Sequence, residues 1–181
     1  MKEFIHNEMM VHVPLCTSKE PKNILIISDD AMGFEVEVKK HDNINFTTMA
    51  CGIDEISKAE DGAFDVVISQ DSVDAFIATH INRVLKDDGL VVMKHPDLDD
   101  VEANKYLMKT VGNYFKIIMP YNLGDCSTAL LASKEYHPTA DIILQRADML
   151  DGLNYYNCDV HVGSFAMGNY IRKEYLGIIK N

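Results

Sequence analysis

Side chains able to bind a charged ligand gather in two segments of the sequence. One of them, residues 155–161, reads Tyr155-Tyr156-Asn157-Cys158-Asp159-Val160-His161. It is too polar for ordinary core and too aromatic for an ordinary loop. The other segment, residues 4–15, carries His6, Asn7 and Glu8 in succession. Both segments are therefore candidates for a binding or catalytic site.

Four more carboxylates follow two apolar, β-branched segments that are typical of buried strands. Asp29 and Asp30 come after residues 23–28, and Asp71 and Asp74 come after residues 64–69. Parallel strands end at the same edge of a sheet, and ligands bind beyond their carboxyl ends. We therefore expect both acidic turns to lie at the edge that holds the site.

The elements that must position these residues alternate between strand and helix. Strands are expected at residues 23–28, 44–49, 64–69, 89–93, 114–119 and 128–132, and helices at 76–85 and 99–110. Residues 34–39 alternate with period two and look like a further strand. The alternation predicts a parallel α/β sheet in a single domain covering residues 1–181.

Composition narrows the class of partner. The chain has 181 residues, 47% hydrophobic and 25% charged, with a net charge of −11, which suits one globular domain with a full core. The negative surface repels nucleic acid and anionic lipid and attracts polycations, although it can also serve solubility alone. We expect no nucleic-acid or membrane partner.

Cysteine spacing and the first residues favour a cytoplasmic protein. Four cysteines stand far apart without a C-x-x-C pair, which argues against zinc and disulfide frameworks: Cys16, Cys51, Cys126 and Cys158. Lys2 and Glu3 precede any apolar run, so no signal peptide is expected, and no run is long enough to span a bilayer.

The two end segments resemble the opening and closing motifs of the spermidine synthase (polyamine aminopropyltransferase) family. Residues 71–74 also resemble its D-S-x-D motif, one position late, and residues 85–92 resemble its L-K-x-D-G-x-V segment. The resemblance runs, with gaps, over residues 4–176. It implies a Rossmann-like, methyltransferase-like fold with helices on both faces of a mostly parallel sheet, and a helix at residues 34–39. The chain between residues 33 and 64 is too short for a full nucleoside-binding half, so we expect about one β-α unit to be missing.

The resemblance also implies a reaction. In the family, decarboxylated S-adenosylmethionine donates an aminopropyl group to putrescine, methylthioadenosine leaves, and no metal takes part. A diamine must lie beside a sulfonium, so carboxylates must offset the like charges and one must accept a proton. Asp71 is the candidate base and Asp74 the candidate anchor of the diamine, the alternative being that both cap the next helix.

The remaining site residues follow from the same motifs. Candidates for the diamine are His6, Glu8, Tyr155 and Tyr156, and the sequence does not choose between the two tyrosines. Candidates for the donor are Asn7, Asp29, Asp30, Gly33 and Asp54. The family's glycine-rich loop is reduced to one glycine here, with Ala31 and Met32 where side chains could obstruct the donor. We expect His12, Asp159 and His161 to be structural.

Three alternatives stay open at this point. A degenerate family member would bind polyamine or nucleoside without turnover, a methyltransferase would use intact S-adenosylmethionine, and an interaction protein would use the scaffold alone. The acidic turn at Asp29 and Asp30 argues against the methyltransferase, because it would repel the carboxylate of the intact donor. The family's small N-terminal β-domain has no counterpart before residue 4, which leaves a homodimer in doubt.

Overall fold

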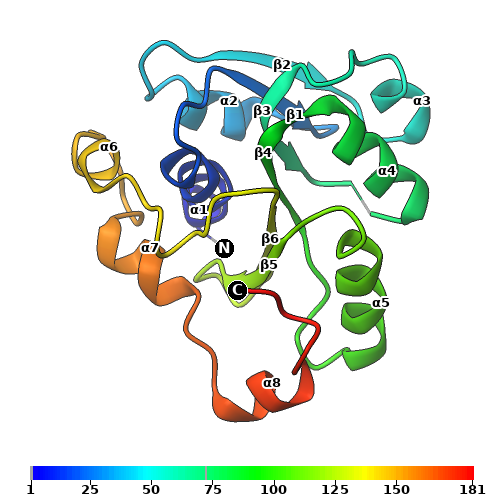
Figure 1. Cartoon of the computed structure of the whole chain (residues 1–181). Coiled ribbons are helices and arrows are strands. Elements are labelled where there is room, and N and C mark those ends of the chain that lie inside the picture. Colours follow the sequence, from blue (N-terminus) through cyan, green and yellow to red (C-terminus); the bar gives the residue numbers. More distant parts are fainter. Residues whose placement is uncertain (1, 72) are drawn as a thin grey trace.

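The computed structural model describes residues 2–71 and 73–181, in which one sheet lies between two layers of helices (Figure 1). The strands are β1 (Asn23–Ile27), β2 (Asn45–Met49), β3 (Phe64–Ser69), β4 (Leu85–Lys94), β5 (Ile117–Asn122) and β6 (Thr128–Ser133). They lie in the order β2-β1-β3-β4-β6-β5; the first four are parallel, and β6 is antiparallel to both of its neighbours. The expected Rossmann-like, mostly parallel sheet is confirmed.

Helices cover both faces of this sheet. They are α1 (Glu3–Thr17), α2 (Met32–Val38), α3 (Ile53–Ile56), α4 (Ala75–Val84), α5 (Val101–Val111), α6 (Leu144–Asp148), α7 (Cys158–Ser164) and α8 (Asn169–Glu174). One apolar core joins the sheet to α1, α2, α6 and α7, and the other joins it to α3, α4, α5 and α8. Within the described residues, no helix has the length and apolar composition needed to cross a membrane.

The central strands are stabilised by the burial of side chains that are mostly apolar, with Asp65 and Ser69 as the buried polar residues of β3. All six residues of β3 are buried, and in β1 only the first is partly exposed. Each fully buried Val, Leu or Ile side chain contributes about 1.5–3 kcal/mol of hydrophobic free energy. These strands therefore fix the position of the turns that follow them, which carry Asp29 and Asp71.

Residues 34–39 do not form the strand that their alternation predicts. They belong to α2, as the family resemblance implied, because Phe34 and Val38 lie four positions apart and are both buried against the sheet layer. Glu37 turns inward to a buried histidine, whereas Val36 is 53% exposed. The expected strand at 114–119 begins instead at Ile117, since Tyr114 still closes the last turn of α5.

Candidate active site

The carboxyl ends of β1, β2 and β3 meet at one edge of the sheet, as the acidic turns predicted. The Asp29 carboxylate accepts a hydrogen bond from the backbone N–H of Cys51 at 3.0 Å, and the Asp71 carboxylate accepts one from Gly52 at 2.8 Å. Because β1 lies between β2 and β3, the loop after β2 crosses the tip of β1 to reach Asp71. Gly52 has φ +123°, a conformation that favours glycine. The two carboxylates therefore hold one shared loop.

These two acids change the chemistry of the thiol beside them. Burial raises the pKa of Cys51, and the neighbouring charges of Asp71 and Asp29 raise it further. A thiol with a raised pKa is a poor nucleophile, so Cys51 is not a candidate for covalent catalysis. The negative potential instead suits a cation placed above the loop.

Asp74 caps a helix in this structure. Its Oδ1 accepts hydrogen bonds from the backbone N–H groups of Phe76 and Ile77, both at 2.9 Å, at the start of α4. This is the capping alternative that the sequence left open for Asp74. Ser72, inside the same motif, lies outside the described residues.

A second cluster forms around His6, on the first turns of α1. His6 Nε2 lies 2.6 Å from the Gln70 amide nitrogen, directly after β3, and His6 Nδ1 lies 3.6 Å from an Asp125 carboxylate oxygen. With the Gln70 amide as donor, His6 Nε2 accepts and the ring proton lies on Nδ1, toward Asp125. Burial lowers the pKa of His6, Asp125 opposes that shift, and the nearby Lys94 reinforces it. His6 is therefore a neutral, hydrogen-bonding ring.

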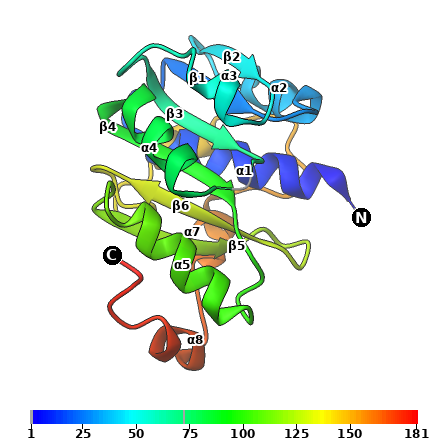
Figure 2. The same cartoon turned by 90° about the vertical axis from the view of Figure 1, so that its right-hand side faces the viewer.

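Asp125 comes from the turn between β5 and β6. Burial acts to raise its pKa, but hydrogen bonds from the Ser127 hydroxyl and N–H, together with His6, outweigh it and hold the pKa below its ordinary value. Figure 2 shows the N-terminal end of α1, the head of β3 and the β5–β6 turn on the same side of the molecule. Asp125 is therefore an ionised carboxylate at the same edge as Asp29 and Asp71.

The closing segment is tied to α1 by Glu8. The buried Glu8 carboxylate accepts the backbone N–H groups of Asn154, Tyr155 and Tyr156, each at 2.8 Å. Both carboxylate oxygens are used by the backbone and no part of the side chain is exposed. The expectation that Glu8 binds the diamine is therefore corrected, and Glu8 positions the closing segment.

The structure separates the two tyrosines. Tyr156 is 3% exposed, and its hydroxyl lies 2.7 Å from His161 Nδ1. Tyr156 is part of the core, which corrects its expected contact with substrate. Tyr155 is only partly buried, and its hydroxyl lies so close to Gly124 that a Cβ there would overlap it. Tyr155 therefore stands beside Asp125.

His161 and His12 are buried, as expected of structural residues. His161 Nε2 lies 3.0 Å from the Pro138 carbonyl oxygen, and His12 Nε2 lies 2.9 Å from Glu37 Oε2. Asp159, expected to be structural like them, is exposed in the first turn of α7.

The expected donor residues lie around the turn between β1 and α2. A Cβ on Gly33 would overlap the Asn7 amide, so Asn7 packs directly against the first turn of α2. Met32 is 72% exposed, so most of its surface faces solvent. Asp30 and Asp54 are exposed, Asp54 in the first turn of α3. Asn7 thus lies against Gly33, Asp29 and Asp71 bind the same loop, and Asp30 and Asp54 are exposed near them.

Sequence reasoning missed three residues of this edge: Gln70, Lys94 and Asp125. Gln70 directly follows β3 and Lys94 ends β4. Asp125 stands in Leu123-Gly124-Asp125, where a glycine with φ +90° marks the turn. Their positions at or after the carboxyl ends of strands could have identified them from the sequence, because ligands bind beyond these ends in such sheets.

Comparison with known proteins agrees with this geometry. A family model of the spermine/spermidine synthase domain matches residues 3–57. The polyamine aminopropyltransferase of Helicobacter acinonychis is 28% identical over 207 residues, covering 92% of this chain and 75% of the relative. That of Helicobacter pylori strain G27 is 26% identical, covering 99% and 80%. The crystal structure of spermidine synthase from Thermotoga maritima has a TM-score of 0.82 at 25% identity, covering 95% of this chain and 74% of that one.

In sequence and in fold, the chain is similar to the spermidine synthases. A second spermidine synthase structure, a complex with the transition state analogue AdoDATO, also has a TM-score of 0.82. A putative O-methyltransferase from Nostoc punctiforme, 13% identical with a TM-score of 0.52, shares the fold alone. The methyltransferase-like Rossmann fold is thereby confirmed.

The relatives carry residues that this chain lacks. The alignment with the Helicobacter acinonychis protein extends over 207 positions, more than the 181 residues of the chain, so the relative has residues without a counterpart here. The strand order begins at β2, which pairs with β1 on one side. The expected shortening by about one β-α unit stays a prediction.

No metal centre emerges from the described part of the chain. Across residues 2–71 and 73–181, no three His, Cys, Asp or Glu side chains gather as metal ligands would. The acids of the edge bind backbone N–H groups, a serine and a histidine instead. What the edge offers is separate carboxylates: Asp29, Asp71 and Asp125.

Proposed function

We propose that the chain transfers an aminopropyl group from decarboxylated S-adenosylmethionine to putrescine, giving spermidine and methylthioadenosine. The amine nitrogen attacks the methylene carbon beside the sulfonium, and a C–N bond forms. The C–S bond breaks, its electron pair stays on sulfur as a neutral thioether, and the amine proton passes to a carboxylate. The observation that carries the proposal is the gathering of Asp29, Asp71 and Asp125 at one sheet edge, in a chain similar to the spermidine synthases.

The donor belongs on the β1–β2 side of this edge. Asn7 and Gly33 offer an amide and a close backbone approach, and the Asp29 carboxylate supplies negative charge for the primary amine of the donor. Asp30 and Asp54 are exposed on the same side of the sheet edge. An acidic turn favours the decarboxylated donor, which carries no carboxylate to be repelled.

The acceptor belongs on the β3–β5 side. We assign Asp71 as the base that accepts the amine proton. It follows β3, which is paired with β1 on the donor side, and β3 is also followed by Gln70, which contacts His6. Because Asp74 is engaged as a helix cap, Asp125 takes its place as anchor of the distal ammonium group. His6 and Tyr155 supply polar rings beside Asp125.

The test is release of methylthioadenosine from the decarboxylated donor, with putrescine, cadaverine or spermidine as acceptor. Loss of a general base lowers kcat by about 10²–10⁴-fold, so Asp71→Asn should do so. Asp125→Asn should instead raise KM for the amine. Asp87→Asn, which removes the same charge from the opposite end of β4, is the matched control. Turnover that survives Asp71→Asn would show that another group is the base.

One observation favours a second function, nucleoside binding without turnover. Lys94 ends β4 close enough to lower the pKa of His6, and a lysine there opposes the cationic acceptor. Thermal shift separates the two functions, since a bound ligand raises stability by mass action. Stabilisation by methylthioadenosine together with absent turnover for every amine tested would favour this second function. We place either activity in the cytoplasm, where the four free cysteines stay reduced.

A further inference from the structure

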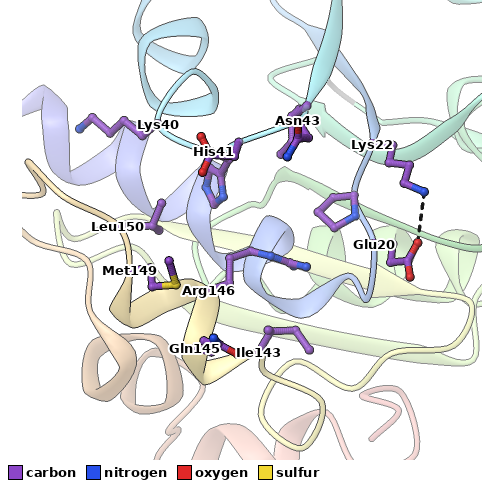
Figure 3. A pocket seen from close by; sticks show the side chains of 13 residues that line it. Glu20, Lys22, Lys40, His41, Asn43, Ile143, Gln145, Arg146, Met149 and Leu150 are labelled. Carbon is purple, nitrogen blue, oxygen red and sulfur yellow. Dashed lines mark ion pairs between the residues drawn. The ribbon is translucent and has the colours of Figure 1, made fainter.

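A pocket of about 420 Å³ opens at the amino-end edge of β1 and β2 (Figure 3). It lies opposite to the candidate active site, and the five residues of β1 separate the two edges by about 17 Å. Its walls come from the connection before β1, the connection before β2, and α6. The volume lies within the range of about 300–1,000 Å³ that is usual for small-molecule sites. Nothing in the proposed reaction uses this pocket.

Arg146, on α6, lines the pocket without an acidic partner. Its guanidinium donates to three backbone carbonyls at the end of α1, those of Leu15, Ser18 and Lys19. A guanidinium has five N–H donors, so two remain, the Nε–H among them. None of the ion pairs formed by the described residues includes Arg146. A half-buried guanidinium with free donors and no carboxylate is suited to an anion.

His41 supplies a fixed hydrogen-bond acceptor on the facing wall. The Glu37 carboxylate accepts from His12 Nε2–H at 2.9 Å, so His12 Nδ1 accepts in turn from His41 Nε2–H at 2.9 Å. Burial lowers the pKa of His41 to about 3, which keeps the ring neutral and leaves Nδ1 as an acceptor. His41 is 8% exposed, its ring points into the pocket in Figure 3, and no hydrogen bond among the described residues reaches Nδ1.

The rest of the wall combines apolar surface with two lysines and two acids, Glu20 and Asp42. Lys22 pairs with Glu20 at 3.2 Å, and Lys40 pairs with the buried Glu37 at 2.7 Å, so neither lysine is an unpaired cation. The apolar lining residues are Pro21, Ile44, Ile143, Met149 and Leu150. Such a wall suits the apolar body of an organic ligand, and the amides of Asn43 and Gln145 also line it.

We propose that this pocket binds a small organic monocarboxylate with an apolar body and one O–H or N–H donor. The carboxylate accepts the two free N–H groups of Arg146, and the donor group of the ligand donates to His41 Nδ1. The apolar body lies against the wall that includes Ile44 and Met149. The ligand thereby supplies the ion pair that Arg146 does not form with any of the described residues.

The test is a titration of the full chain followed by the backbone amide signals in NMR, with 4-hydroxybenzoate as the probe. We expect saturable shifts confined to the pocket residues. Methyl 4-hydroxybenzoate lacks the negative charge and should bind at least about tenfold more weakly. Benzoate lacks the donor and should bind about threefold more weakly or worse. Equal affinity for acid and ester, or equal affinity for inorganic phosphate, would overturn the proposal.

Three variants make the test specific to the site. Ile44→Trp fills the partly buried wall and should abolish the shifts, as should Arg146→Met. Arg146 also holds the end of α1, so Ile44→Trp decides the question if Arg146→Met fails to fold. Arg172→Met removes the same charge at an exposed position of α8 and should leave binding unchanged. Shifts that persist in Ile44→Trp, or that map around His6, would refute the assignment.

Discussion

Glu8→Gln is the substitution that most directly tests how the closing segment is held. The Glu8 carboxylate is fully buried and accepts three backbone N–H groups, each at 2.8 Å. Glutamine has one acceptor oxygen, so if that oxygen keeps Tyr155 and Tyr156, its NH₂ group faces the N–H of Asn154. One charge-assisted hydrogen bond, worth about 1.5–3 kcal/mol, is lost, and the other two become neutral and about half as strong. We expect the free energy of unfolding to fall by about 3–5 kcal/mol.

Urea unfolding measures this loss, followed by circular dichroism and by tyrosine fluorescence, since the chain has no tryptophan. Glu3→Gln is the matched control, because Glu3 is exposed in the first turn of the same helix. The control should change stability by no more than about 0.5 kcal/mol. A loss of less than about 1 kcal/mol for Glu8→Gln would refute the reasoning, because it would mean that the three N–H groups find other partners.

Three further predictions concern single groups. Asp74→Ala removes the cap of α4 and should cost about 0.5–2 kcal/mol of unfolding free energy while kcat and KM stay within twofold; a large rise in KM for putrescine would restore Asp74 as its anchor. Lys94→Gln should lower KM for putrescine by about threefold to fivefold, whereas Lys94→Arg should not, because the exposed like charge is worth up to about 1 kcal/mol; an unchanged KM would contradict this. Burial lowers the pKa of His41 to about 3 and those of His95 and His161 to about 4. On acidification, each of these three imidazole rings therefore binds a proton in the unfolded chain before it does so in the folded chain. The free energy of unfolding should be at its full value above about pH 6.5 and should fall below that pH, by up to about 1.4 kcal/mol per pH unit for each ring. Urea unfolding at pH 7, 6 and 5 measures this, and a flat profile would exclude it.

Much of the sheet could be predicted from local pattern. The predicted strand at residues 64–69 coincides with β3, and that at 128–132 falls within β6, because continuous apolar runs bounded by turn residues have few alternatives. The alternation at 34–39 misled, since six residues with period two also fit a short helix whose buried positions are four apart. Tertiary contact decided that case through the burial of Phe34 and Val38.

The candidate site divides in the same way. Asp29 and Asp71 could be placed at one edge from sequence, because parallel neighbours end together. The separation of Tyr155 from Tyr156 could not, since adjacent residues point in different directions and only packing decides which is buried. Asp125 was also out of reach, because it lies 119 positions from His6 in the sequence and meets it through the β5–β6 turn.

The sequence by itself indicated the resemblance to the spermidine synthase family, the positions of most strands, and the acidic character of one sheet edge. The tertiary structure decided what each acid does: Glu8 holds a segment, Asp74 caps a helix, and Asp125 faces His6. The physical reason is that residue type fixes the charge a side chain can carry. Whether a carboxylate accepts hydrogen bonds from backbone N–H groups or is available to a ligand depends on neighbours that are far away along the chain.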